Sequence, residues 1–197
     1  MQEFWDKRYS EKEYAYGESP NQFFMNEIQN LEPGTLLLPA EGEGRNAVFA
    51  AGIGWNVTAF DYSINAIQKA INLAKKKNVN FEYLHRNFDS LKLIDEHFDC
   101  IALTFVHPPA EKRCSIHRNL LNYLKIGGKL ILEGFSKKQI DKNSGGPKNK
   151  EMLFSKEEIA RDFEQLKDIK ISEEEIILQE GIYHRGPASV IRLTGIK

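Results

Sequence analysis

The stretch LLLPAEGEGRNAVFAAG, residues 36–52, joins a short apolar run to a segment of small residues through two glycines that are one residue apart. The apolar run at 35–39 is typical of a buried strand, and residues 44–52 have the character of a helix. Glycine in the turn between them permits positive φ and close approach of the backbone to a ligand. The stretch therefore predicts a strand–turn–helix unit whose turn is a candidate binding site.

Strand-like and helix-like segments alternate after this unit. Apolar positions in the helical segment 63–77 (Ile64, Ile67, Ile71 and Ala74) recur every three or four residues, and Ser63 is its expected N-cap. The pair Gly127–Gly128 is expected to close a helix at 114–124. Further strands are expected at 56–60, 80–85, 98–106 and 128–135. This alternation predicts a parallel sheet with helices on both faces.

The C-terminal part has a different pattern. Residues 155–166 form an amphipathic segment that opens with a capping box, Ser155 with Glu158. Two long strand-like segments, 169–181 and 188–195, follow with no helix between them, which predicts an antiparallel hairpin. The predicted fold is α/β and Rossmann-like, a single domain with a seven-stranded, mostly parallel sheet. Residues 1–24, rich in aromatic residues, and the polar loop 136–151 fit no regular element; the loop is either a binding loop or a mobile surface loop.

Composition excludes several classes of protein. The 197 residues are 41% hydrophobic and 28% charged, with a net charge of −1, so nothing global favours binding to nucleic acid or to anionic membranes. No apolar stretch is long enough to span a bilayer, and the N-terminus lacks the apolar core of a signal peptide, which predicts a cytoplasmic protein. The two cysteines, Cys100 and Cys114, are too few for a disulfide framework and have no zinc-binding spacing.

Asp61 narrows the identity of the ligand. It ends the second predicted strand, 17 residues after Gly44, where an acid is placed to accept hydrogen bonds from ribose hydroxyls. The alternative is that Asp61 stabilises the following helix dipole. Two acids in the turn, Glu41 and Glu43, would repel a pyrophosphate and suit a ligand that carries an amino group or a sulfonium. This argues for S-adenosylmethionine over NAD, although Ala47 satisfies the Gly/Ala form of the dinucleotide fingerprint.

Eight motifs together resemble the class I S-adenosylmethionine-dependent methyltransferases, in the small bacterial branch related to tellurite-resistance and thiopurine methyltransferases. They are FWDKRY (4–9), YGESPN (16–21), EGEGRNAVFAAG (41–52), VTAFDYS (57–63), FVHPP (105–109), LKIGGKLILEGF (124–135), GGPK (145–148) and EGIYHRGPASVIRLTG (180–195). The resemblance covers nearly the whole chain and implies the same fold, cofactor and reaction.

The resemblance also implies roles for individual residues. Asp61 binds the ribose hydroxyls with Tyr62 beside the adenine, and the aromatic residues of segment 1–24, including Tyr9, close over the pocket as a lid. Leu38 stands where many relatives have an acid, so Glu41 or Arg45 with Asn46 are expected to take over its contacts. The expected cofactor-binding set is Trp5, Tyr16, Ala40, Glu41, Gly42, Gly44, Arg45, Asn46, Asp61, Tyr62, Ser63, Asn87, Phe88 and Phe105.

Methyl transfer from a sulfonium is an in-line displacement, in which the protein mainly positions the reactants and excludes water. A thiolate acceptor needs no strong base, whereas a hydroxyl or amine does. His107, at the end of the fourth predicted strand, is the first candidate base, and the alternative is a polar strand cap before Pro108 and Pro109. His184 is the second candidate, whereas His117 is expected to be structural or exposed. The histidines share no metal-ligand spacing, so no metal is expected.

The predicted function is a methyltransferase for a small molecule, with a thiol or a chalcogen oxyanion as the candidate acceptor and no nucleic-acid or membrane partner. The motif at 107–109 resembles the Pro-Pro motif of nucleic-acid amino-methylating enzymes, but His107 replaces its acid or amide. Three alternatives stay open: a non-catalytic S-adenosylmethionine-binding protein of the same fold, one directed at nucleic acid or protein, and an NAD-dependent reductase.

Overall fold

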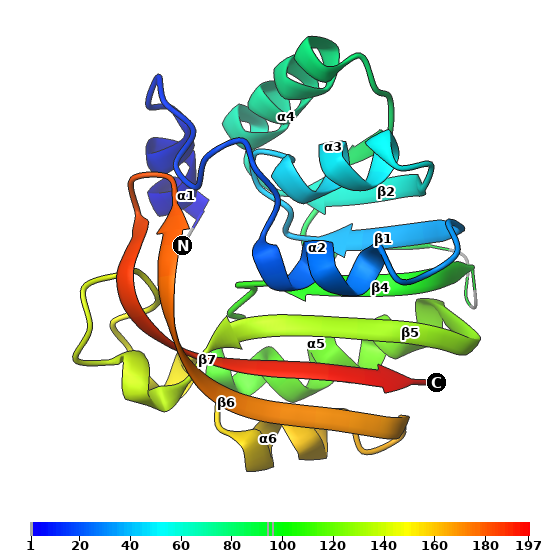
Figure 1. Ribbon diagram of the computed structural model, residues 1–197, viewed down its shortest axis with the longest axis vertical. Coiled ribbons are helices and arrows are strands. Elements are labelled where there is room, and N and C mark those ends of the chain that lie inside the picture. The colour runs from blue at the N-terminus through cyan, green and yellow to red at the C-terminus, as the bar shows by residue number, and fades with distance from the viewer. Residues whose placement is uncertain (1, 94, 96) are drawn as a thin grey trace. The chain divides into compact units, whose positions relative to one another are not determined.

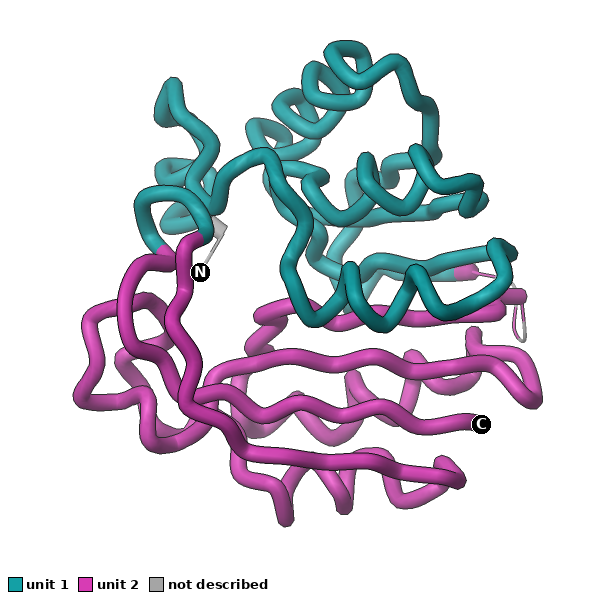
Figure 2. Tube along the Cα trace, viewed as in Figure 1, with its two compact units in different colours: residues 1–92, 180–183 teal, residues 93–179, 184–197 magenta. Residues whose placement is uncertain are grey.

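The computed structural model describes residues 2–93, 95 and 97–197. They divide into two compact units, residues 1–92 with 180–183 and residues 93–179 with 184–197 (Figure 2). The seven strands form a mixed sheet, in the order β3-β2-β1 within the first unit and β4-β5-β7-β6 within the second (Figure 1). The predicted Rossmann-like α/β fold is confirmed, whereas the single-domain organisation stays a prediction.

The first unit contains the strand–turn–helix unit that the sequence predicts. Its three strands, β1 (Thr35–Pro39), β2 (Asn56–Asp61) and β3 (Glu82–His85), are parallel. Two helices follow the first two strands, α3 (Arg45–Gly52) after β1 and α4 (Ile64–Lys77) after β2. These elements lie within one or two residues of their predicted bounds, because each has a clear apolar period and a turn signal at its ends.

The buried face of helix α4 includes Ile67 and Ala74 as predicted, but is shifted away from the other two expected positions, Ile64 and Ile71. Ile64 is 58% exposed and Ile71 38% exposed. The buried positions are Ala66, Ile67, Ala70, Leu73 and Ala74. Alanine at position 70 lets α3 approach closely, since a Cβ on Gly44 would lie 2.5 Å from the Ala70 Cβ. Ser63 caps α4 as predicted, by accepting the Ala66 N–H at 3.3 Å.

Two helices lie in the N-terminal segment, where no regular element is predicted from the sequence. Helix α1 (Gln2–Tyr9) packs against α4, and α2 (Gln22–Ile28) packs against α3. Both are too short to be stable by themselves, so tertiary contacts decide their conformation. Asn21 caps α2 by accepting the Phe24 N–H at 2.8 Å.

The second unit contains the antiparallel hairpin. Strand β5 is parallel to β4 and antiparallel to β7, which lies between β5 and the edge strand β6. Helix α6 opens with the predicted Ser155–Glu158 capping box. The elements of this unit are β4 (Phe98–Thr104), α5 (Ala110–Tyr123), β5 (Leu124–Phe135), α6 (Lys156–Asp162), β6 (Lys167–Glu180) and β7 (His184–Ile196).

The glycine pair at 127–128 does not close α5, contrary to the prediction. The helix ends at Tyr123 and the chain passes directly into β5 at Leu124, which is buried. Gly127 then lies inside the strand with φ of +81°. Extended backbone at Leu124 ends the helix before the glycines, and a local glycine signal does not report such a tertiary effect.

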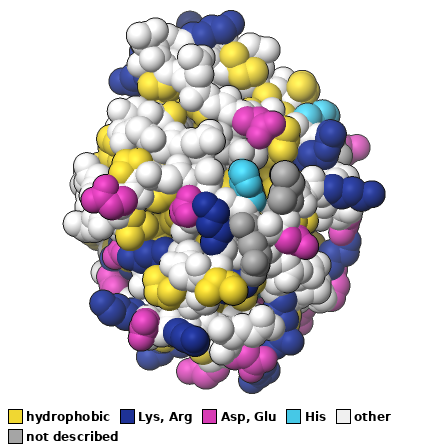
Figure 3. Space-filling view, turned by 90° about the vertical axis from the view of Figure 1, so that its right-hand side faces the viewer, with side chains coloured by type: hydrophobic (Ala, Val, Ile, Leu, Met, Phe, Trp, Pro, Cys, Tyr) yellow, Lys and Arg dark blue, Asp and Glu magenta, His cyan; other side chains and the backbone are white. Residues whose placement is uncertain are grey.

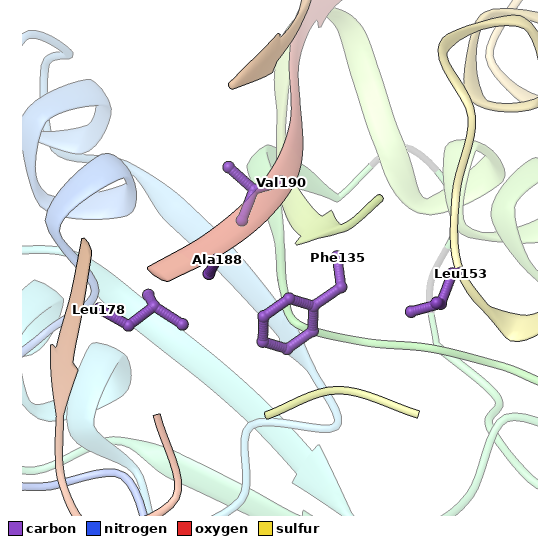
Figure 4. Packing of buried hydrophobic residues seen from close by; sticks show 5 residues of the cluster. All are labelled: Phe135, Leu153, Leu178, Ala188 and Val190. Carbon is purple, nitrogen blue, oxygen red and sulfur yellow. The ribbon is translucent and has the colours of Figure 1, made fainter. Parts of the chain in front are cut away.

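The loop 136–151 is anchored through Gln139 and Ser144. It contains two short 3₁₀ helices, Lys137–Gln139 and Lys150–Met152. The buried Gln139 side chain donates to Ser144 Oγ and accepts the Ser189 N–H, both at 2.9 Å. Beside it lies an apolar cluster of Phe135, Leu153, Leu178, Ala188 and Val190 (Figure 4). In the described ranges, no helix combines the length and apolar character that crossing a bilayer requires.

Replacing Gly44 tests the close packing of α3 on α4. Gly44→Ala is expected to lower the free energy of unfolding by about 2–4 kcal/mol, from the left-handed backbone and the clash with Ala70. Gly127→Ala is the matched control, since Gly127 has φ of +81° against +82° at Gly44, but a Cβ at Gly127 would have no atom within 4 Å. Gly127→Ala should lower the free energy of unfolding only by the cost of the left-handed backbone, about 1–2 kcal/mol. Equal losses in urea titrations would contradict the packing argument.

Candidate cofactor site in the first unit

Asp61 and Gly42 bring the end of β2 and the glycine turn into contact. Asp61 Oδ2 accepts the Gly42 N–H at 3.0 Å, and Oδ1 accepts the Ser63 N–H at 2.9 Å. The side chain is buried, and this burial raises its pKa to about 6. A carboxylate accepts about four hydrogen bonds. Two bonds to the backbone therefore orient Asp61 and leave capacity for ligand hydroxyls.

Gly42 is enclosed by two tyrosines, the buried Tyr9 and the partly buried Tyr83. Its carbonyl accepts the Tyr83 hydroxyl at 2.6 Å. A Cβ at Gly42 would lie 2.8 Å from the Tyr9 hydroxyl oxygen, and φ there is +65°. Both the backbone conformation and the available space therefore require glycine at this position.

Glu41 completes the N-terminus of α3. The N-cap of this helix is Gly44, which has no side chain to accept a backbone N–H. Glu41 Oε1 instead accepts the N–H groups of Asn46 at 2.8 Å and Ala47 at 2.9 Å. Burial raises the pKa of Glu41 to about 7. The Glu41 carboxylate thus caps α3 from the preceding turn, in place of an N-cap side chain.

Glu43 joins the glycine turn to α4 and to the N-terminal segment. Its Oε1 lies 2.7 Å from Lys69 Nζ, and its Oε2 accepts the Ala15 N–H at 2.8 Å. Lys69 also donates to the carbonyl of Glu13 at 2.6 Å. The bonds of Glu41 and Glu43 that the structure shows are internal, and the expectation that these carboxylates suit a cationic ligand stays a prediction.

Arg45 and Asn46 hold the N-terminal segment and the hairpin turn. Arg45 pairs with Glu180 at 2.8 Å and donates to the carbonyl of Tyr16 at 3.1 Å. Asn46 Oδ1 accepts the Asn21 N–H at 2.9 Å. These contacts give both side chains structural partners, and Leu38, at the position of the missing acid, is buried in β1.

The aromatic residues of the N-terminal segment gather beside this turn. Trp5 stacks on Tyr9 with ring centroids 5.5 Å apart, and Tyr16 lies 6.4 Å from Trp5. Asp6 accepts the Ser63 hydroxyl at 2.5 Å, which fastens α1 to the start of α4. The structure therefore brings Trp5 and Tyr16 to the end of β2.

The residues expected near an adenine follow β2 and β3. Tyr62 is half-buried, and burial together with the Asp61 charge raises its pKa. Phe88 packs edge-on against Phe60, with ring centroids 5.3 Å apart. Asn87 is exposed and accepts the Ser90 N–H at 2.8 Å. Ala40 has φ of +48°, an unusual conformation for a residue other than glycine.

Phe105, His107 and His184 belong to the second unit, around Phe135. His107 Nδ1 lies 2.8 Å from the Met152 carbonyl, and its Nε2 accepts the Phe135 N–H at 3.0 Å. Burial lowers the pKa of His107 to about 4. Both ring nitrogens are engaged, so accepting a substrate proton would require one of these bonds to break. The His184 ring lies edge-on to Phe105, with centroids 4.6 Å apart.

Several residues that build the site have no signal in the sequence. Tyr83, Lys69 and Glu180 reach the glycine turn from distant segments, and only the fold brings them together. Asn21 is the exception, because an asparagine just before the apolar run at 22–28 is a helix-capping signal.

His117 lies apart from the glycine turn, in the second unit. It is fully buried, and its Nδ1 lies 2.9 Å from Asp162. Asp162 also accepts a hydrogen bond from Arg113 Nε at 2.7 Å. The expectation that His117 is either structural or exposed therefore resolves in favour of a buried side chain that joins α5 to α6.

Part of the chain is similar in sequence to known proteins. Residues 39–128, which include the glycine turn, Asp61 and β4, match the family model described as a methyltransferase domain. This part of the chain is therefore similar to methyltransferase domains. The chain is 32% identical over 124 residues to the ubiquinone/menaquinone biosynthesis C-methyltransferase UbiE of Shewanella sediminis, covering 60% of this chain and 49% of UbiE. It is 28% identical over 89 residues to TehB of Haemophilus influenzae, covering 44% of this chain and 31% of TehB.

Solved structures agree on the fold. The crystal structure of TehB from Haemophilus influenzae has a TM-score of 0.69 at 17% identity, covering 100% of this chain and 66% of that one. A second structure comes from work on the conversion of a disulfide bond into a thioacetal group during echinomycin biosynthesis. It has a TM-score of 0.81 at 16% identity and covers 100% of this chain and 91% of that one. The predicted resemblance to class I S-adenosylmethionine-dependent methyltransferases of the TehB-like branch is confirmed, and S-adenosylmethionine is the cofactor that this family implies.

The Glu43 carboxylate provides a test of how the glycine turn holds the N-terminal segment. Glu43→Gln leaves Lys69 without its buried partner and is expected to lower the free energy of unfolding by about 2–4 kcal/mol. Glu18→Gln is the control, because the Lys76–Glu18 pair is exposed. Glu18→Gln should lower the free energy of unfolding by less than about 1 kcal/mol. Similar losses in urea titrations would show that the Glu43 bonds do not fix the segment.

The raised pKa of Glu41 predicts a pH-dependent stability. Its pKa is about 7 in the folded protein against 4.5 ordinarily, so the folded state holds this proton more tightly. The associated stability is present below pH ~4.5 and is lost as the pH rises through ~7. Glu41→Gln mimics the protonated form, so its stability relative to the native protein should increase across this window. Urea titrations at several pH values measure the difference, with Glu82→Gln as the exposed control; a pH-independent difference would contradict the assignment.

Proposed function

We propose that the chain is an S-adenosylmethionine-dependent methyltransferase that acts on a small molecule. The observation that carries the proposal is the Asp61 carboxylate, which ends β2, is oriented by the Gly42 and Ser63 N–H groups and has acceptor capacity to spare. It lies within residues 39–128, the part of the chain that is similar to methyltransferase domains. The chain spans about half the length of UbiE and less than a third of TehB, so the activity of those proteins is not transferred as a whole.

The residues of the first unit fit the cofactor that the family implies. Asp61 would accept the ribose hydroxyls, and Trp5 and Tyr16 would cover the bound molecule. Tyr62 and Phe88 would flank the adenine. When bound, S-adenosylmethionine supplies an electrophilic methyl group whose bond to sulfur breaks, with its electron pair, as the bond to the acceptor forms. The protein orients the two partners and excludes water.

The state of His107 favours acceptors that are nucleophilic without a base. Both of its ring nitrogens bond to the backbone, and its lowered pKa keeps it neutral. A thiolate or a chalcogen oxyanion carries its own electron pair at neutral pH, whereas a hydroxyl or an ammonium must first lose a proton. We therefore retain a thiol or a chalcogen oxyanion as the proposed acceptor, with the loop 136–151 on the substrate side.

A small-molecule acceptor also agrees with the charge distribution. The net charge is −1, and on the face drawn in Figure 3 basic and acidic side chains are interspersed. Sequence-independent binding to nucleic acid needs clustered basic groups. The cytoplasmic location stays a prediction from the sequence.

Asp61→Asn tests the cofactor site. The substitution keeps the size of the side chain but removes its charge, so the affinity for S-adenosylmethionine, measured by isothermal titration calorimetry, should fall roughly 10- to 100-fold. Asp95→Asn, an exposed aspartate, is the control and should bind like the native protein.

The same titration has a pH dependence with a defined sign. Ribose hydroxyls donate to the ionised carboxylate, and the pKa of Asp61 is about 6. Affinity should therefore rise as the pH increases through about 6, and this rise should be absent in Asp61→Asn. Absence of binding by the native protein, or unchanged affinity in Asp61→Asn, would overturn the proposed function.

A further inference from the structure

The side chain of Arg8 is enclosed by aromatic rings. Its Cζ lies 3.9 Å from the ring centroid of Tyr183, 4.6 Å from that of Phe4 and 5.6 Å from that of Trp5. Its Nη1 donates to the Tyr16 hydroxyl at 3.1 Å. All of these residues belong to the first unit, where α1 and the hairpin turn 180–183 lie side by side (Figure 2).

Arg8 differs from the comparable arginines in its partners. Every other arginine that is at least half-buried forms an ion pair: Arg45 with Glu180, Arg113 with Asp162, Arg118 with Glu164 and Arg192 with Glu133. In the part of the chain that the structure describes, Arg8 has no carboxylate at ion-pair distance. The nearby Glu11 is bonded to the Tyr183 hydroxyl at 2.8 Å.

The aromatic contacts and the hydrogen bond to Tyr16 do not use all of the donors on the guanidinium edge of Arg8. Aromatic rings contact a guanidinium through its flat faces, whereas its five N–H donors point outward in the plane. Tyr16 takes one donor. The remaining donors match the paired oxygens of a carboxylate or an oxyanion, and a side chain already held by its neighbours loses little entropy when it binds one.

The enclosure adjoins the candidate cofactor site. Trp5 stacks on Tyr9, and the Tyr9 hydroxyl lies against Gly42. Phe4 is 54% exposed, so an apolar surface borders the cation. We propose that Arg8 binds an anionic group, a carboxylate or an oxyanion, of the methyl acceptor, and that the surrounding rings contact the apolar body of that acceptor. This inference rests on the proposed function, because it assigns a property to the acceptor of that reaction.

Two aromatic thiols of similar size serve as probes, 2-mercaptobenzoate, which carries a carboxylate, and its methyl ester, which does not. Each is titrated into protein saturated with S-adenosylhomocysteine, and binding is followed by the fluorescence of Trp5, since the only other tryptophan, Trp55, is buried. The native protein should bind the acid at least tenfold more tightly than its ester. Arg8→Gln should remove this preference, because it should weaken binding of the acid roughly 10- to 100-fold. Arg8→Lys should retain part of it, because it keeps the charge but not the planar fork.

Lys7→Gln is the matched control, with the same change of charge at an exposed position on the same helix. It should retain the preference for the acid. Equal binding of acid and ester by the native protein, absence of binding by both, or an unchanged preference in Arg8→Gln would overturn the inference.

Calorimetry with S-adenosylhomocysteine alone separates the possible sources of the anion. Unchanged affinity in Arg8→Gln places the anion on the acceptor. A loss of roughly tenfold or more would show that Arg8 binds the cofactor's own carboxylate, which overturns the assignment to the acceptor. If the native protein binds neither S-adenosylmethionine nor S-adenosylhomocysteine, the proposed function fails as well; if it binds both but does not prefer the acid, this inference alone fails.

Discussion

The buried carboxylate of Glu43 is the constraint on which the first unit depends. A charge that is removed from water must be paired and hydrogen-bonded, or its burial is too costly. Glu43 meets this requirement with Lys69 from α4 and with the Ala15 N–H from the N-terminal segment. Two segments that are far from the glycine turn in the sequence are therefore fixed to one side chain, and the turn has a defined position beside α4.

Polar groups around the turn differ in whether their bonding capacity is used. Glu41 caps α3, Glu43 holds the N-terminal segment, and Arg45 pairs with Glu180. Asp61 is bonded by backbone N–H groups but by no cationic side chain among those described, and Arg8 has aromatic rings in place of a carboxylate. Ligand recognition is therefore assigned to the groups with spare capacity rather than to all charged groups near the turn. This distinction separates the residues that build the site from those proposed to bind in it.

The sequence predicts the fold better than it predicts the roles of the charged residues. Strands and helices with a clear apolar period, such as β1 and α4, lie where their patterns place them. Helix α1 and the direct passage from α5 into β5 depend on contacts with distant residues, which no local pattern reports. The position of Asp61 follows from the strand order. The internal roles of Glu41 and Glu43 do not, because a carboxylate in a glycine turn has the same local sequence whether it faces a ligand or a helix end.

The most direct test of this account is a crystal structure of the protein with S-adenosylhomocysteine. The account predicts that the ribose hydroxyls contact the Asp61 carboxylate, while Glu43 keeps its bonds to Lys69 and to the Ala15 N–H. A nucleoside bound away from Asp61, or a Glu43 carboxylate that leaves Lys69 to contact the ligand, would contradict it.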